Sequence, residues 1–197
     1  MKEPQSEARY ELVVCRSRFI GYGCRIDCAE AARNLVRRER ELHPGCTHVV
    51  FAYRHGASGD LFGMSDDREP KGTAGKPILD LLKGEGVTNV LVAVTRYFGG
   101  TKLGTGGLVK AYTATARGVV DKLALADYVE MAQFTLHAAY DLYERASRFV
   151  VETGGRIDDV AFGERVTMIG RVPAQRWSDL HELLLGLSSG RFGLESS

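Results

Sequence analysis

A thirteen-residue segment, Arg96–Leu108 (RYFGGTKLGTGGL), contains five glycines and constrains the fold of this chain more than any other stretch. The apolar run before it, Asn89–Thr95, predicts a strand, and the spacing of apolar residues from Leu108 onward predicts a helix. Glycine lets the backbone adopt positive φ angles and lets another surface approach the main chain closely. A strand-to-helix turn also directs backbone N–H groups and the positive end of the helix dipole toward one point. The segment therefore predicts a turn that binds phosphate or another anion.

Side chains in the same segment extend this prediction to nucleic acid. Arg96 and Lys102 would neutralise phosphates, and Tyr97 or Phe98 would stack on bases. The alternative is that the glycines serve tight turns and close helix–sheet packing and that the aromatic rings lie in the core. The residues predicted to bind an anion, nucleic acid or partner here are Arg96, Tyr97, Phe98, Gly99, Gly100, Lys102, Gly104, Thr105, Gly106 and Gly107.

A second unusual segment, Ser65–Pro77 (SDDREPKGTAGKP), places a Gly-Thr-Ala-Gly turn before a short predicted helix at Lys76–Leu82. Such a turn would present N–H groups, and Lys76 a positive charge, to an anion. The segment is not a P-loop, because Pro70 takes the place of the first glycine and Pro77 that of the Ser or Thr. The predicted binding residues here are Gly72, Thr73, Gly75 and Lys76.

Three acids in this segment, Asp66, Asp67 and Glu69, are candidate ligands for Mg²⁺. The alternative is a solvated loop whose acids cap the following helix. A zinc site built from Cys24, Cys28 and Cys46 with nearby histidines is disfavoured, because no pair has C-x₂-C spacing. No recognisable catalytic motif is present, so we expect neither a cofactor nor a metal.

The composition is that of a folded protein, with 44% hydrophobic and 26% charged residues among 197. The net charge is +1; residues 130–197 contain ten acids and seven arginines, a net charge of −3, so the rest carries +4. The opening residues after Met1 are polar, and no apolar stretch reaches membrane-spanning length. We therefore expect a cytoplasmic protein with reduced cysteines and no membrane contact.

The periodicities predict two domains, residues 1–128 and 129–197, both mixed α+β. The second part predicts strand, helix, hairpin, helix and a final strand from Arg191, which is the ferredoxin-like βαββαβ order. The first part predicts three strands and a helix before the polar stretch at 55–75. These strands are Tyr10–Cys15, Phe19–Cys24 and Thr47–Tyr53, and the helix begins with a capping box at Asp27 and Glu30 and ends near Leu42.

The segment RYFGGTKLGTGGLVKAY, preceded by GVTNVLVAVT and SDDREPKGTAGKPIL, closely resembles the IMPACT/YigZ family over roughly Ser17–Leu123. The resemblance implies an N-terminal βαβ-type α+β domain similar to domain IV of elongation factor G, followed by a ferredoxin-like domain. Eukaryotic members regulate translation by interfering with activation of a nutrient-sensing initiation-factor kinase. They use an added N-terminal partner-binding domain that has no counterpart in this sequence. Arg68 stands where the family pattern has glycine, which argues against a positive-φ turn there.

The sequence thus favours a non-catalytic protein linked to translation regulation, in which the two glycine-containing loops form one surface. This surface would bind RNA, the ribosome or a translation-associated protein. One alternative is a metal-dependent enzyme that acts on a phosphorylated small molecule or nucleotide, with Asp66, Asp67 and Glu69 holding the metal. Another is a module whose C-terminal domain binds a partner protein through its sheet.

Overall fold

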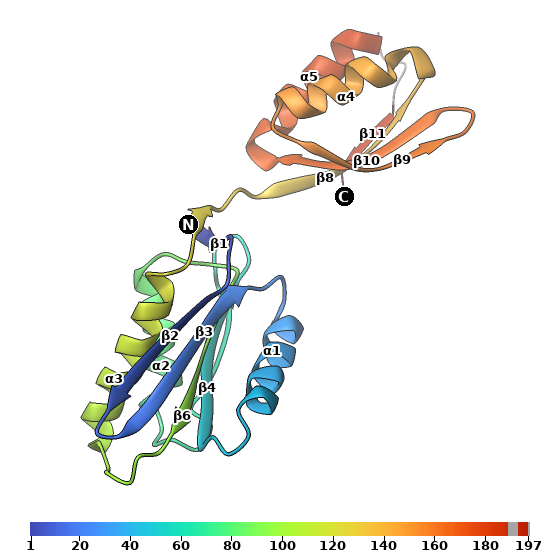
Figure 1. Cartoon of the computed structure of the whole chain (residues 1–197). Helices are drawn as coiled ribbons and strands as arrows, with labels where there is room; N and C mark the ends of the chain where they lie inside the picture. Colours follow the sequence, from blue (N-terminus) through green and yellow to red (C-terminus); the bar gives the residue numbers. More distant parts are fainter. Residues whose placement is uncertain (189–192, 197) are drawn as a thin grey trace. The chain divides into compact units, whose positions relative to one another are not determined.

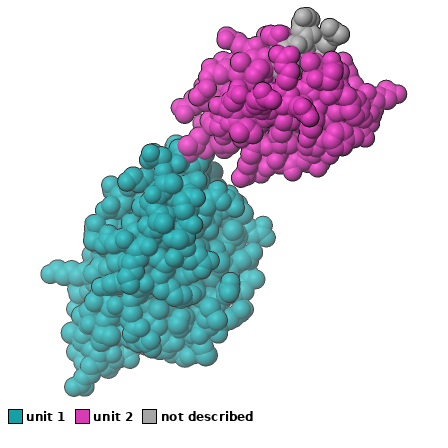
Figure 2. All heavy atoms as spheres, turned by 45° about the horizontal axis from the view of Figure 1, so that its top comes forward, with its two compact units in different colours: residues 1–128 teal, residues 129–197 magenta. Residues whose placement is uncertain are grey.

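The computed structural model describes residues 1–188 and 193–196 and divides the chain into two compact units, Met1–Tyr128 and Val129–Ser197 (Figures 1 and 2). Each unit has its own hydrophobic core. The predicted two-domain α+β class is therefore confirmed. Among the described residues, no helix is both long and apolar enough to cross a bilayer.

The first unit is built on a five-stranded sheet in which every neighbouring pair is antiparallel. The central strand, β6 (Val90–Tyr97), is buried on both faces, as its apolar sequence predicts. Both β3 (Ser17–Arg25) and β4 (His48–His55) pair with β6, so their connection through α1 (Ala29–Leu42) is a split βαβ unit. In spatial order the strands are β2 (Ala8–Val14), β3 (Ser17–Arg25), β6 (Val90–Tyr97), β4 (His48–His55) and β5 (Leu61–Ser65). A two-stranded ladder joins β1 (Lys2–Pro4) to β7 (Leu125–Asp127).

Helices cover both faces of this sheet (Figure 1). Helices α2 (Gly75–Gly84) and α3 (Gly104–Val120) pack on one face, and α1 (Ala29–Leu42) packs on the other. The predicted apolar stripe of α3 is confirmed: its members Leu108 and Tyr112 belong to the core beneath it.

The second unit has the ferredoxin-like order predicted for residues 129–197. In spatial order the described strands are β11 (Gly193–Ser196), β8 (Met131–Ala138), β10 (Val166–Pro173) and β9 (Arg156–Phe162), and neighbouring strands are antiparallel. The elements are β8 (Met131–Ala138), η1 (Tyr140–Leu142), α4 (Tyr143–Glu152), β9 (Arg156–Phe162), β10 (Val166–Pro173), η2 (Ala174–Arg176), α5 (Trp177–Ser188) and β11 (Gly193–Ser196). The predicted start of the last strand, Arg191, lies outside the described residues.

Three local predictions were wrong. Strand β5 lies within the stretch that was predicted to be a polar loop. The prediction failed because β5 is an exposed edge strand with a central glycine, so its sequence does not alternate between apolar and polar residues. Helix α3 begins one turn before Leu108, the predicted start. This first turn buries little surface and therefore has no apolar pattern from which its position could be predicted. The first residue of α1 is preceded by Cys28, whose Sγ accepts the N–H of Ala31, so Cys28 rather than Asp27 is the N-cap.

Candidate functional site

Both glycine-containing segments meet at one end of the first unit, the end farthest from β1 (Figure 1). We call it the glycine-loop end and define it by the hairpin turn 15–16 and the loops 43–47, 66–74 and 98–103. Two hydrogen bonds of 3.1 Å secure the last of these loops. The N–H of Phe98 donates to Thr47, and the N–H of Gly99 donates to Ser17. The predicted neighbourhood of the two segments is therefore present.

Arg96 lies inside this end of the sheet and does not face solvent. It is only 5% exposed, and its guanidinium donates a 2.6 Å hydrogen bond to Glu69, which is 8% exposed. A second nitrogen donates to Ser17 at 3.3 Å. Since successive strand residues face opposite sides, Arg96 points toward α3. The prediction that Arg96 neutralises phosphate does not fit this position, because a buried arginine needs an internal counter-charge.

The Glu69 carboxylate is the centre of a buried polar cluster. It accepts a 2.6 Å hydrogen bond from the hydroxyl of Tyr112, and the Nε2 atom of His48 lies 3.7 Å away. His48 is oriented by its other ring nitrogen, which lies 2.7 Å from the backbone oxygen of Asp67. Burial, followed by the hydrogen bond to Glu69, raises the pKa of Tyr112. The cluster joins β4, β6 and α3 to the loop that precedes α2.

The predicted anion site at the start of α2 is already filled by a carboxylate of the chain itself. Asp66 accepts the backbone N–H groups of Gly72 at 2.7 Å, Ala74 at 3.0 Å and Gly75 at 2.8 Å. Thr73 is buried and donates its hydroxyl to Pro70. These groups are therefore not available to a ligand, and Gly72, Thr73 and Gly75 do not form the predicted cradle. The capping alternative describes Asp66 correctly.

Lys76, the fourth residue predicted there, is exposed on the first turn of α2. It forms an i,i+4 ion pair with Asp80 at 2.8 Å. A surface pair of this kind is weak, so Lys76 retains its charge at the rim of the glycine-loop end.

The acids proposed as metal ligands have separate partners. Asp67 accepts the N–H of Val49 at 2.6 Å and pairs with Arg40, whereas Asp66 and Glu69 are engaged as described above. Within residues 1–188 and 193–196, no group of three or more His, Cys, Asp or Glu is placed to hold a metal ion. In this arrangement the three carboxylates of the described loop are not gathered into one set of metal ligands.

Asp67 and Arg68 both adopt positive φ angles, 42° and 69°. The expectation that a side chain at position 68 prevents such a turn was wrong. The turn persists because Asp66 and Asp67 anchor it through their hydrogen bonds, which outweigh the unfavourable backbone conformation.

Four of the five glycines in loop 98–103 and the first turn of α3 are required by the fold. Gly100 and Gly104 have φ angles of 83° and 69°. A Cβ on Gly99 would overlap the backbone of Arg16, and one on Gly107 would lie 2.9 Å from the Cβ of Leu103. Gly106 differs, because its φ is ordinary and a Cβ there would meet nothing within 4 Å. The packing interpretation therefore accounts for four glycines and not for Gly106.

The start of α3 has no comparable carboxylate acceptor among the described residues. Its N-cap is Leu103, no side-chain hydrogen bond caps it within residues 1–188 and 193–196, and its first turn contains no acid. Gly104, Thr105 and Gly106 are exposed there. In the part of the chain that the structure describes, Lys102 is exposed and has no ion-pair partner. These N–H groups and the adjacent charge form the type of site that attracts an anion.

The two aromatic residues before this helix have different roles. Tyr97 is half-buried, and its hydroxyl lies 3.2 Å from Nδ1 of His43, near the end of α1. Phe98 is 47% exposed, and the guanidinium carbon of Arg96 lies 5.5 Å from its ring centroid. Phe98 is therefore the ring available for stacking.

Sequence reasoning missed two further cations at this end, Arg16 and Lys71. Both are exposed, and neither has an ion-pair partner among the described residues. Lys71 precedes the Gly-Thr-Ala-Gly turn, so its place in that motif was a usable signal. Arg16 comes from a distant hairpin, and only its packing against Gly99 shows that it belongs to this end.

Comparisons with known proteins cover both units. The model of the Impact N-terminal domain family matches residues 15–120, and that of a domain of unknown function, DUF1949, matches residues 136–191. The IMPACT family member YigZ of Escherichia coli (strain K12) is 34% identical over 181 residues, covering 91% of this chain and 89% of the relative. The IMPACT family member YvyE of Bacillus subtilis (strain 168) is 29% identical over 188 residues, covering 92% of this chain and 84% of the relative.

One solved structure is similar along nearly the whole chain. It is a crystal structure described as that of a hypothetical protein, with a TM-score of 0.75 and 32% identity. The match covers 98% of this chain and 95% of the other. The likeness thus extends over both α+β units.

Proposed function

The chain belongs to the IMPACT family, and from that premise we propose that it is a non-catalytic cytoplasmic protein that binds RNA of the translation machinery at the start of α3. The eukaryotic members that the sequence resembles regulate translation. We therefore propose the ribosome as the partner. The proposal applies to the glycine-loop end of the first unit.

The observation that carries this proposal is the contrast between two glycine-rich helix starts. At α2 the N–H groups are taken by Asp66, so the protein supplies its own anion. At α3 no side chain in the described part of the chain accepts the corresponding N–H groups, and no acid lies in the first turn. A phosphate supplied by a partner would accept hydrogen bonds from the N–H groups at the start of α3, as Asp66 does at the start of α2.

The positive charge around the start of α3 favours a polyanionic ligand. Lys102, Lys71 and Arg16 are exposed at the same end, and no carboxylate among the described residues pairs with them. Three such cations suit successive phosphates of one strand. The residues proposed to contact RNA are Phe98, Gly100, Lys102, Gly104, Thr105 and Gly106, with Arg16 and Lys71 beside them.

The exposed ring of Phe98 favours an unpaired strand over a duplex. Bases of single-stranded RNA stack on aromatic side chains, whereas bases in a duplex are covered by their neighbours. Phe98 presents its ring at the entrance to the helix start, held by its N–H bond to Thr47. We therefore expect loops of ribosomal RNA to bind better than helical segments.

Fluorescence anisotropy with labelled single-stranded RNA, and titration with purified ribosomes, tests the proposal. Three phosphate contacts predict that log K falls with log salt with a slope of about −2 on single-stranded RNA. Lys102→Gln should weaken binding and reduce that slope by about 0.7. Lys122→Gln, at the other end of α3, is the matched control and should change neither. Absence of binding to RNA and ribosomes at low salt would overturn the proposal, as would equal effects of the two substitutions.

A further inference from the structure

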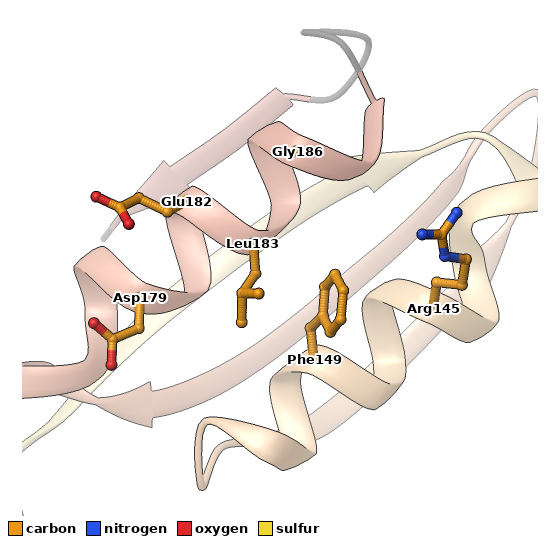
Figure 3. A pocket seen from close by; sticks show the side chains of 6 residues that line it. All are labelled: Arg145, Phe149, Asp179, Glu182, Leu183 and Gly186. Carbon is orange, nitrogen blue, oxygen red and sulfur yellow. The ribbon is translucent and has the colours of Figure 1, made fainter.

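A groove lies between α4 and α5 on the surface of the second unit (Figure 3). Its volume is about 600 Å³. Of its lining residues, Phe149 also packs partly against the core, whereas Arg145 and Glu182 lie on the exposed sides of their helices. The residues that line it are Arg145, Phe149, Asp179, Glu182, Leu183 and Gly186.

Charge is separated along the groove. Figure 3 shows Arg145 at one end, Asp179 and Glu182 at the other, and Phe149 and Leu183 directed toward each other between them. Asp179 forms an i,i+3 pair with Arg176 at 2.5 Å. Over the described ranges, neither Arg145 nor Glu182 has an ion-pair partner. The groove thus has an apolar centre, a positive end and a negative end.

Two residues of α5 that line the groove suit close packing by a partner. Leu183 is 38% exposed although the same helix places Leu180 and Leu184 in the core. Gly186 lies within the helix, and a Cβ there would meet none of the described atoms within 4 Å. Alanine is a better helix former than glycine, so the fold itself does not call for glycine at this position. A helix packing across the groove would call for it, because small residues allow close approach.

We propose that the occupant of this groove is a second copy of the same chain, related by a two-fold axis that passes through the apolar centre, parallel to the surface and perpendicular to the groove. Such an axis places the positive end of one copy over the negative end of the other. Arg145 of each copy then faces Glu182 of the other, and Leu183 of each copy packs beside Phe149 of the other. A single groove therefore supplies both halves of a self-complementary interface. This inference is independent of RNA binding, which concerns the other unit.

Sedimentation equilibrium of the full chain tests the dimer. The unmodified protein should show a monomer–dimer equilibrium, and Leu183→Glu should yield only monomers. Leu185→Glu is the matched control: Leu185 is 44% exposed on the same helix, but two residues on it points about 200° away and does not line the groove. A protein that stays monomeric at the highest concentration reached contradicts the proposal, and so do equal losses for the two leucines.

Charge reversal identifies the axis. Arg145→Glu and Glu182→Arg should each raise the dimer dissociation constant roughly tenfold or more, because each places like charges opposite one another twice. The double variant Arg145→Glu/Glu182→Arg restores both pairs and should return most of the affinity. Both residues are exposed, and circular dichroism confirms that each variant is folded. A double variant as weak as the worse single one rejects the two-fold arrangement.

Discussion

The guanidinium of Arg96 donates a 2.6 Å hydrogen bond to the carboxylate of Glu69, and this pair is buried beside Tyr112, which lies in the middle of α3. It holds the loop before α2 against the strand that leads into the glycine segment. The pair therefore fixes the shape of the glycine-loop end without facing a ligand.

Removing one partner of this pair should lower the stability of the folded protein. Arg96→Met leaves the Glu69 charge buried and is expected to lower the free energy of unfolding by about 3–5 kcal/mol. The double variant Arg96→Met/Glu69→Leu removes both charges and should lose less. Urea denaturation measures both values. If Arg96→Met costs less than about 1 kcal/mol, as is typical of an exposed pair, the buried pair does not stabilise the loop as inferred.

Asp66→Ala should destabilise the first unit by about 2 kcal/mol or more, because three backbone N–H groups lose a charged acceptor. Thermal or urea unfolding gives the difference. Asp60→Ala is the control, since Asp60 is exposed and has no hydrogen-bond or ion-pair partner in residues 1–188 and 193–196. Equal stabilities of the two variants would contradict the capping role of Asp66.

Arg68→Gly is expected to stabilise the protein by about 1 kcal/mol, because glycine adopts a φ of 69° without the cost that a Cβ imposes. Arg68→Ala separates the causes, since alanine removes the charge and keeps the Cβ. Only the glycine variant should gain stability in urea denaturation. A similar gain for alanine would assign the effect to the charge of Arg68.

Gly106→Ala should raise the free energy of unfolding by about 0.5–1 kcal/mol and at the same time weaken RNA binding. The added methyl group has room in the free protein and would obstruct a phosphate at the helix start. Gly84→Ala, at the far end of α2, also has room and should raise stability without affecting binding. Unchanged anisotropy titrations for Gly106→Ala would argue against close approach of RNA there.

The stability of the first unit should fall in alkaline solution. Burial raises the pKa of Tyr112 above its ordinary value of 10.0, so the folded state keeps this proton when the unfolded state has lost it. The contribution is therefore complete below pH 10 and is lost as the pH rises above it, by about 1.4 kcal/mol per pH unit. Burial also raises the pKa of Tyr22, which adds to the same loss.

Unfolding curves recorded between neutral pH and the alkaline range test this. Tyr112→Phe should be less stable than the unmodified protein at neutral pH, because the hydrogen bond to Glu69 is lost. Above pH 10 it should lose stability less steeply, and Tyr22→Phe/Tyr112→Phe less steeply still. Parallel curves for all three proteins would show that these hydroxyls do not cause the alkaline loss.

Periodicity was sufficient for most of the architecture. The buried run of β6, the stripe of α3 and the βαββαβ order of the second unit follow from the spacing of apolar residues, which reports the face that each element buries. Elements without a buried face were missed. Strand β5 and the first turn of α3 have no apolar pattern, so the sequence did not reveal where they begin.

The amino-acid sequence by itself determined that the chain has two unusual glycine-containing segments and that each precedes a helix. Only the tertiary structure decided which residues remain free to bind. Arg96 and Glu69 carry charges expected of a binding site, yet they pair with each other across 27 residues of the chain. Asp66 accepts the N–H groups of the turn that leads into α2. By contrast, Lys102 has no ion-pair partner among the described residues, and a Cβ placed on Gly106 would meet none of the described atoms within 4 Å. Whether a charged side chain is free to bind a ligand depends on the groups that folding places next to it. These contacts form between segments and cannot be read from the residue itself.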